Sequence, residues 1–295
     1  MGVLGWQALG MGLLTGSILW GFSLWRQRLD HIPDHAEGLA ALTLVATCAG
    51  GFWGAFAWAP NYPYAFSWAL PGLAAKMLAA AGWSFALAAF LALRKPFATH
   101  LRMVVAMLWV YLAPLTLAIL TQHLARLDFG RAVTWAFFAI VLALLLASSV
   151  TLWHLRNFKE MDGRPAPALR LCLLGIAGVS GAWALALFLW PNGPLPLIWP
   201  WQGDPLTTRL IASMFLSVAT GAWIARASRS LAQTALWVTL AYGLGVVIAV
   251  LAHALTGQAT ERGYAGGAFP VSYMVVWGGL GLCAALALLA SRPAR

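Results

Sequence analysis

The sequence predicts an all-α, polytopic helical membrane protein with about nine transmembrane helices. Of the 295 residues, 62% are hydrophobic and only 9% are charged, and the mean hydropathy is +0.80. Soluble globular domains carry roughly 25% charged residues. Apolar stretches of roughly 20 residues recur along the chain. Each can cross a hydrocarbon core roughly 30 Å thick as a helix that satisfies its own backbone hydrogen bonds.

The expected spans follow one another with short polar connections. They cover residues 4–25, 38–59, 70–93, 101–122, 132–155, 169–190, 206–226, 232–255 and 271–291. The first stretch has no basic residue before it and is too long for the apolar part of a cleaved signal, so we expect it to be retained. Cys48, Cys172 and Cys283 fall in different spans and form no C-x-x-C pair, which argues against a disulfide framework or a thiolate zinc site.

Lys and Arg residues fall mainly on one side of these spans. The loops after the first, third, fifth and seventh spans and the C-terminal segment carry Arg26, Arg28, Arg94, Lys95, Arg102, Arg156, Lys159, Arg164, Arg170, Arg226, Arg229, Arg292 and Arg295. The opposite loops and adjoining helix ends carry Arg126, Arg131, Arg209 and Arg262. Because basic loops stay in the cytoplasm, we expect an outside N-terminus and a cytoplasmic C-terminus. The net charge of +10 then reflects the membrane, and no nucleic-acid partner is expected.

One stretch of the chain occurs twice. The sequence LWVYLAPLTLAILTQH, residues 108–123, resembles LWVTLAYGLGVVIAVLAH, residues 236–253, and the turns after the second and sixth spans also align. We therefore expect two four-helix repeats, residues 1–128 and 129–257, and an additional C-terminal helix within residues 258–295. Each repeat contains an even number of spans, so the copies point the same way, related by an axis along the membrane normal.

Both aligned turns are rich in proline and aromatic residues, including Trp68 in the first and Trp199 and Trp201 in the second. Two interpretations are open. Indole rings prefer the level of the lipid headgroups, so these residues could form an interfacial aromatic belt. Alternatively, the proline-stiffened turns could form a lid over an outward-facing or lipid-facing pocket, because ordering such turns costs little entropy.

Lys76 and Arg209 occupy matching positions, a little over one turn inside the third and seventh spans. A cation at this depth opposes the positive N-terminal end of the helix macrodipole, so its position requires an explanation. One explanation is snorkelling, in which the long stem lies among acyl chains and the charge reaches outward. The other is an anion site, in which the cation and the helix-terminal N–H groups hold a lipid headgroup or a carboxylate.

His123 and His253 end the two copies of the repeated helix, so they should lie at a similar depth near the outer face. Two histidines from separate helices can bind a b-type haem or a metal ion. The alignment of the two needs a two-residue insertion, and the alternative is a hydrogen-bonded interfacial histidine. His31 and His35 lie close together in the first inner loop, where Pro33 favours a solvated loop over a chelating helix.

The sequence gives little support for an enzyme or an ion-driven pump. All acidic residues fall in expected loops, whereas proton-coupled and sodium-coupled carriers usually place a coordinating group near the membrane midplane. No nucleophile elbow, phosphate-binding loop or H-E-x-x-H motif is present. Ser148, Ser149 and Thr151 are expected to bond back to their own helix.

Small residues predict where helices approach closely. Gly12 and Gly16 in the first span, and Gly50 and Gly54 in the second, have small-xxx-small spacing, and glycines are frequent in the last two spans. Such positions form internal seams more often than subunit contacts. Pro114 aligns with Tyr242, so a kink in one copy could open a cavity in one half alone.

The segment WPWQGDPLTTRLIASMFL, Trp199 to Leu216, resembles a signature of functionally uncharacterised bacterial multi-span membrane proteins, in which W-P-W and then P-L-x-x-R open a helix. The first copy departs from it, with Ser67 and Lys76 where the second has Pro200 and Arg209. The resemblance implies a bacterial inner-membrane protein and carries no activity.

Three functional hypotheses follow. The first is a non-catalytic protein, either an accessory subunit of a membrane complex or a binder of lipid or quinone-like molecules in the outer leaflet. The second is a transporter or permease with a path between the two halves. The third is a membrane redox protein with haem at His123 and His253.

Overall fold

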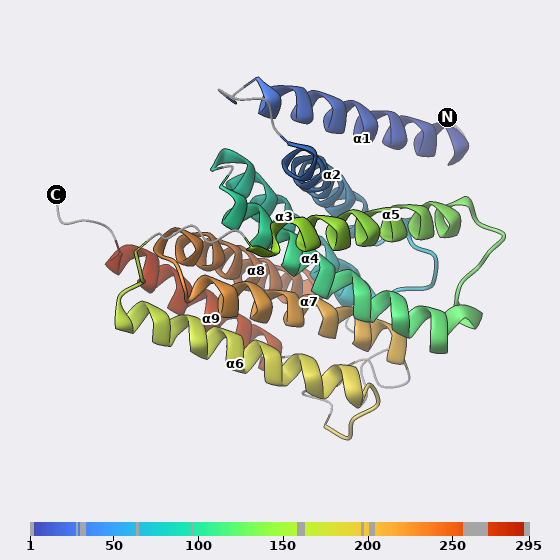
Figure 1. Ribbon diagram of the computed structural model, residues 1–295. Helices are drawn as coiled ribbons and strands as arrows, with labels where there is room; N and C mark the ends of the chain where they lie inside the picture. Colours follow the sequence, from blue (N-terminus) through green and yellow to red (C-terminus); the bar gives the residue numbers. More distant parts are fainter. Residues whose placement is uncertain are drawn as a thin grey trace.

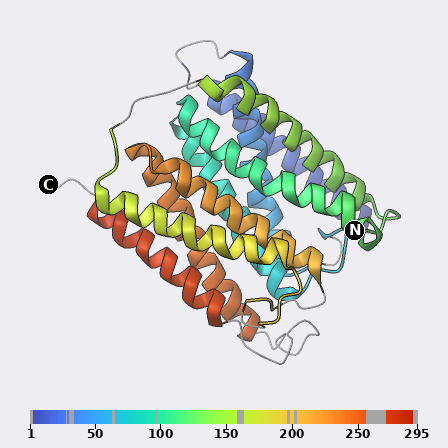
Figure 2. The ribbon, with the colours of Figure 1, turned by 60° about the horizontal axis from the view of Figure 1, so that its bottom comes forward.

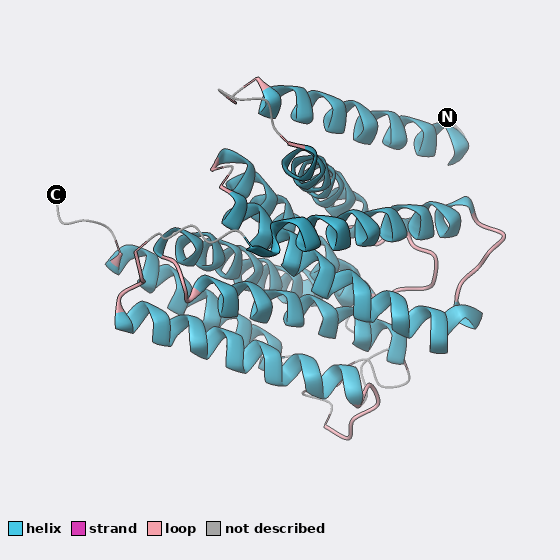
Figure 3. Cartoon of the chain, viewed as in Figure 1, coloured by secondary structure: helices cyan, strands magenta, loops and turns pink. Residues whose placement is uncertain are grey.

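The computed structural model describes residues 3–27, 29, 34–62, 65–95, 97–157, 163–195, 198–200, 204–255 and 271–291, with side chains from residue 9 onward. The described residues form helices and connecting loops, with no strand among them (Figure 3). The α-helices are α1 (Val3–Arg26), α2 (His35–Trp58), α3 (Gly72–Arg94), α4 (Ala98–Ala118), α5 (Ala132–His154), α6 (Pro167–Leu189), α7 (Pro205–Ala225), α8 (Arg229–Leu255) and α9 (Val271–Ala290).

The all-helical prediction is confirmed, and each expected span corresponds to one helix. Within the described residues, eight helices are long and apolar enough to cross a membrane, and α1 is outside that set. The span that starts with α4 continues through η2 (Ile119–His123), a single π turn, and η3 (Leu124–Arg126), a 3-10 turn. The chain therefore has the fold of a multi-pass membrane protein.

Local sequence signals set several helix starts. The carboxylate of Asp34 accepts a hydrogen bond from the backbone N–H of Glu37 (2.7 Å) at the start of α2. Asp204 caps α7, where its carboxylate accepts bonds from the backbone N–H of Thr207 (3.2 Å) and from the Thr207 hydroxyl (2.6 Å). Pro205 at the first position of α7 loses no helical hydrogen bond and has a φ suited to a helix start.

Four helices form the centre of the molecule. In Figure 1, α3, α4, α7 and α8 lie in the middle of the ribbon, with α1 above and α6 and α9 below. The closest pairs are α2 with α3, α6 with α7, and α8 with α9. Helix α1 packs chiefly on α2, and the indole N–H of Trp53 donates to the Ser17 hydroxyl across that contact (3.0 Å). It is thus the most peripheral helix.

The central packing is compatible with the predicted internal duplication. Helix α3 packs on α8, and α4 packs on α7. Exchanging α3 with α7 and α4 with α8 converts one pair into the other, as a two-fold relation between the copies requires. The boundaries at residues 128 and 257 stay a prediction. The contacts of α2 with α5 and of α6 with α9 also fit units of α2–α5 and α6–α9, in which α1 is the unpaired helix.

The two copies fill their helix interfaces differently. In the first copy, α2 and α3 approach so closely that a Cβ atom added to Gly51 would overlap the Gly82 carbonyl oxygen. Phe215 follows Arg209 at the same interval at which Gly82 follows Lys76, so an aromatic ring replaces a glycine in the second copy. There the Phe215 ring lies 6.1 Å from that of Trp183. The helices of the first copy therefore touch directly at this position, whereas aromatic side chains fill the space between the helices in the second copy.

The same aromatic cluster contains Tyr242, the counterpart of Pro114. Its ring lies 4.7 Å from that of Trp277, which lies 4.5 Å from Phe215. Pro114 lies inside α4, one turn before η2. The two copies therefore differ at this level, where aromatic rings fill the second copy, and the kink and cavity expected at Pro114 stay predictions.

Glycine seams occur at other positions than the spacing predicts. A Cβ at Gly12, Gly16 or Gly50 would meet no protein atom within 4 Å, and one at Gly54 would meet the ring of Trp58 on its own helix. The predicted seams at these residues are therefore wrong, because the glycines point away from neighbouring helices. The expectation for the last two spans is confirmed, since a Cβ at Gly243 would lie 3.0 Å from the Cα of Gly281.

Candidate functional site

The bundle has two chemically different ends. We call the end that carries His123 and His253 the histidine end, and the opposite end, with Arg94, Arg156 and Arg226, the arginine end. At the arginine end, Arg156 lies over the Trp153 ring at 3.9 Å. The sequence predicts that the arginine end is cytoplasmic, and the candidate site lies at the other end.

Arg209 and His123 meet at the histidine end. The Arg209 Nη1 atom lies 2.7 Å from the His123 Nε2 atom. Since a guanidinium only donates, His123 accepts this hydrogen bond at Nε2 and carries its proton on Nδ1. The Arg209 Nε–H donates to the Phe188 carbonyl oxygen (3.3 Å), and the guanidinium lies 6.0 Å from the Phe188 ring centroid. The contact joins η2, α6 and α7.

The chain places the two side chains by separate local features. Asp204 and Pro205 define the start of α7, which puts Arg209 a little over one turn inside that helix, as predicted. His123 is the last residue of the π turn η2. A π turn is wider than an α turn, so it changes the direction in which His123 points relative to a continuous helix. Isolated π turns are frequent at functional sites.

The site holds a cation inside the expected membrane span. His123 is only 5% exposed, and Arg209 is half-buried. Among the described residues, no carboxylate lies within ion-pair distance of Arg209, and the Asp204 carboxylate is bonded to Thr207. The positive charge also lies near the positive N-terminal end of α7. A guanidinium in this position attracts an anion.

Lys76 and His253 occupy the corresponding positions in the other copy. Lys76 is half-buried on α3, His253 is 3% exposed on α8, and the two helices pack against each other. The structure thus places a half-buried cation and a buried histidine on each of two packed helix pairs, α4 with α7 and α3 with α8. Direct contact between cation and histidine is seen for Arg209 and His123.

The predicted tryptophans divide into two groups. Trp68 and Trp199 are buried, and neither indole N–H has a partner in the described part of the chain. Trp68 packs edge-on against the Phe137 ring at 6.0 Å, and Trp199 lies so close to Gly193 that any Cβ there would overlap its ring. Both turn inward, unlike the residues of an exposed belt. Trp201 lies outside the described residues.

Other aromatic residues of the same turns are compatible with the aromatic-belt interpretation, which stays a prediction. Trp190 is exposed, as is Tyr62 in the first copy. The turn of the first copy is also tied to a second loop by a backbone hydrogen bond. In the first copy, the backbone N–H of Asp128 donates to the Ser67 carbonyl oxygen (3.2 Å), joining two loops at the histidine end.

The haem and metal hypotheses concern the same histidines. In this structure the Nε2 atom of His123 is engaged by Arg209. The described residues contain no group of three or more His, Cys, Asp or Glu side chains that could hold a metal ion. The His31 part of the first inner loop lies outside the described residues.

Polar residues away from this site have structural partners or stay apart from it. The Ser149 hydroxyl donates to the Leu145 carbonyl oxygen (2.8 Å), as expected, and accepts from the Trp109 indole (2.9 Å). The hydroxyls of Ser148 and Thr151 are buried without a partner among the described residues, so the expected back-bonding is wrong for these two. Glu37 lies in the first turn of α2, not in a loop.

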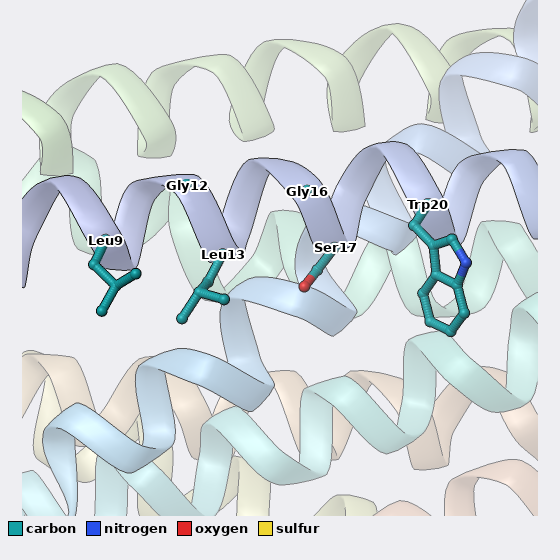
Figure 4. Close-up of a pocket in the computed structure, with 6 residues that line it drawn as sticks. All are labelled: Leu9, Gly12, Leu13, Gly16, Ser17 and Trp20. Carbon is teal, nitrogen blue, oxygen red and sulfur yellow. The ribbon is translucent and has the colours of Figure 1, made fainter.

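Helix α1 has a shallow surface groove of about 530 Å³. It is lined by Leu9, Gly12, Leu13, Gly16, Ser17 and Trp20, all on α1. Figure 4 shows the side chains of Leu9, Leu13, Ser17 and Trp20 along one side of the helix. This surface is apolar and open, as expected for a helix at the periphery.

The sequence predicted Arg209 and His123 as members of two different sites. Their contact was missed because it depends on how α4 and α7 pack and on the π turn. The available signal was their shared depth, since both were expected near helix ends on the same side of the membrane.

Comparison with family models, with curated proteins and with solved structures finds no match for this chain.

Proposed function

We propose that the protein is a non-catalytic, multi-pass membrane protein that binds an anionic amphiphile, such as a lipid headgroup, at Arg209 and His123. The observation that carries this proposal is the half-buried guanidinium, which donates to His123 and to the Phe188 carbonyl and has no carboxylate partner among the described residues. Placing such a charge in a membrane span is costly unless a counterion offsets it.

The fixed geometry of the guanidinium suits a phosphate or carboxylate. Two of its nitrogen atoms are held by neutral acceptors, which orients the planar group while leaving further N–H donors for a ligand. Bonds from a guanidinium to an anion are charge-assisted and are strongest where water is excluded. An amphiphile satisfies both conditions, because its headgroup reaches the cation while its apolar part stays among acyl chains.

A second candidate role is favoured by α1. This helix packs chiefly on α2, and Ser17 in the groove of Figure 4 contacts α2, but Leu13 and Trp20 of the same groove are exposed and available to another membrane helix. An accessory subunit of a larger membrane complex would use such a surface. Headgroup binding and this role are compatible, since the first involves the charged Arg209 on α7 and the second the apolar surface of α1.

The headgroup proposal is tested by counting retained lipid. Wild-type protein purified from bilayers of equal phosphatidylglycerol and phosphatidylcholine is expected to keep phosphatidylglycerol in native mass spectra. Arg209→Gln should retain about tenfold less at this site, because it removes a charge-assisted contact of roughly 1.5–3 kcal/mol. Arg131→Gln is the matched control, since Arg131 is an arginine at the same end of the bundle, at the N-cap position of α5. Equal retention in wild type and Arg209→Gln would contradict the proposal.

A further inference from the structure

A second apolar groove lies between α6 and α7, toward the arginine end. It has a volume of about 340 Å³ and is lined by Leu174, Ala177 and Gly178 from α6 and by Ala219, Thr220 and Trp223 from α7. The two helices run side by side in Figures 1 and 2. Three of these lining residues, Ala177, Gly178 and Ala219, are small, which leaves the groove open on its outer side. A Cβ at Gly178 would meet no protein atom within 4 Å.

The one side-chain hydroxyl in the lining already has a hydrogen-bond partner. The Thr220 hydroxyl donates to the Leu216 carbonyl oxygen of its own helix (2.8 Å). The groove between the two helices is therefore apolar, which suits an acyl chain and not a polar solute.

A fixed cation lies at one end of this groove. The Arg226 guanidinium lies over the Trp223 ring at 3.3 Å, and its Nε–H donates to the Trp223 carbonyl oxygen (3.0 Å). Trp223 is itself part of the groove lining, so the groove and the cation share one side chain. The other guanidinium N–H groups have no hydrogen-bond partner in the described part of the chain, which leaves them available to an anion.

A second basic residue lies at the same level. Arg170 on α6 is exposed and precedes Leu174 by four residues, which places the two on one face of the helix. Arg170 and Arg226 thus flank the mouth of the groove from α6 and α7.

The depths of these groups match those of a phospholipid. Arg226 directly follows α7, and the groove residue Ala219 lies seven residues earlier, which is about 10 Å along a helix. The charge therefore lies at the helix ends, at the level of the headgroups, and the apolar groove begins at the depth where the acyl chains begin.

We propose that this groove binds one anionic phospholipid from the leaflet at the arginine end, with an acyl chain between α6 and α7 and the phosphate against Arg226. The stack on Trp223 orients the guanidinium for the phosphate, and the small residues Gly178 and Ala219 make room for the chain. The site is separate from that of Arg209, which lies at the other end of α7, and does not depend on it.

The structure provides matched variants for a test. Gly178→Leu adds a bulky side chain to the groove at a position whose Cβ would meet no protein atom within 4 Å, and Arg226→Gln removes the charge. Gly175→Leu is the steric control, since Gly175 also has no protein atom within 4 Å of its Cβ and lies outside the groove. Arg94→Gln is the charge control, because Arg94 ends α3 at the same end of the bundle and lies over the Phe90 ring at 5.8 Å.

The experiment is photo-crosslinking in vesicles of phosphatidylcholine that contain a trace of phosphatidylglycerol with a diazirine on one acyl chain. In the wild type we expect crosslinks in the tryptic segments 171–209 and 210–226. Gly178→Leu and Arg226→Gln should each lower this labelling about tenfold, with Gly175→Leu and Arg94→Gln close to the wild type.

Several outcomes would overturn the proposal. Labelling spread evenly over all helices would show that the groove is not a site. An equal loss in Arg94→Gln would show general attraction to the charged surface. Equal labelling by a phosphatidylcholine probe would remove the role of Arg226. Crosslinks are assigned to positions in the chain, so the two sites are tested separately. A negative crosslinking result at the α6–α7 groove would not affect the lipid count for Arg209, and a negative lipid count for Arg209 would not affect the crosslinking result.

Discussion

The guanidinium of Arg209 and the imidazole of His123 come from residues far apart in the sequence and depend on each other. His123 accepts a hydrogen bond at Nε2, and Arg209 loses one of its few acceptors if that nitrogen is removed. A donor left without a partner in a buried position costs roughly 1–3 kcal/mol, and more when it is charged. At the residue scale, this bond is the feature on which the candidate site depends.

His123→Phe should therefore lower the free energy of unfolding by roughly 1–3 kcal/mol, because it keeps the ring and removes the acceptor. His123→Gln, which retains an acceptor, should recover part of the loss. The measurement is thermal unfolding in detergent, followed by tryptophan fluorescence. His154→Phe is the control, since His154 is exposed at the end of α5. A midpoint for His123→Phe equal to that of the wild type would show that the hydrogen bond contributes little.

Helix contacts in the first copy are made by a different pair of glycines from those that spacing alone suggests. The small-xxx-small pattern pointed to Gly50 and Gly54, but the structure places Gly51 against Gly82. One residue along a helix turns the side-chain direction by more than a quarter of a circle. The pattern thus identified the helix that approaches its neighbour closely, and packing decided which of its faces does so.

At the element scale, Gly51→Ala should separate α2 from α3 and destabilise the protein by about 1–3 kcal/mol, as overpacked interfaces do. Gly50→Ala should be neutral or slightly stabilising, since Gly50 has no protein atom within 4 Å of its Cβ and alanine favours helices. Denaturation of both variants in the same detergent compares them directly. The prediction is wrong if the two neighbouring substitutions have equal effects.

The two ends of the molecule differ in charge, as the distribution of basic residues among the loops predicts. Basic residues gather at the arginine end, and the candidate anion site of Arg209 lies at the histidine end. Together with the groove beside Arg226, this arrangement puts a cation near each end of α7, and each belongs to one of the two proposed headgroup sites. A protein that contacts lipids in both leaflets at defined positions would be oriented and held firmly in its bilayer.

The predicted orientation is tested with single cysteines in a chain whose Cys48, Cys172 and Cys283 are replaced by serine. Gly130→Cys lies at the histidine end and Gly163→Cys at the arginine end, and both positions are exposed. A membrane-impermeant maleimide should label Gly130→Cys in intact cells, and Gly163→Cys only in inside-out vesicles, because basic loops stay in the cytoplasm. The reverse pattern would invert the topology.

The sequence by itself determined the helices, their order and approximate ends, and the equivalent positions of Lys76 with Arg209. These properties are local, because hydropathy, proline and capping residues act within one helix or turn. It did not determine that Arg209 bonds to His123, that Gly51 meets Gly82, or that a groove ends at Trp223 and Arg226. Only the tertiary structure decided these, because such contacts depend on the direction of each side chain around its helix axis, which the π turn at Ile119–His123 and the packing of neighbouring helices set together.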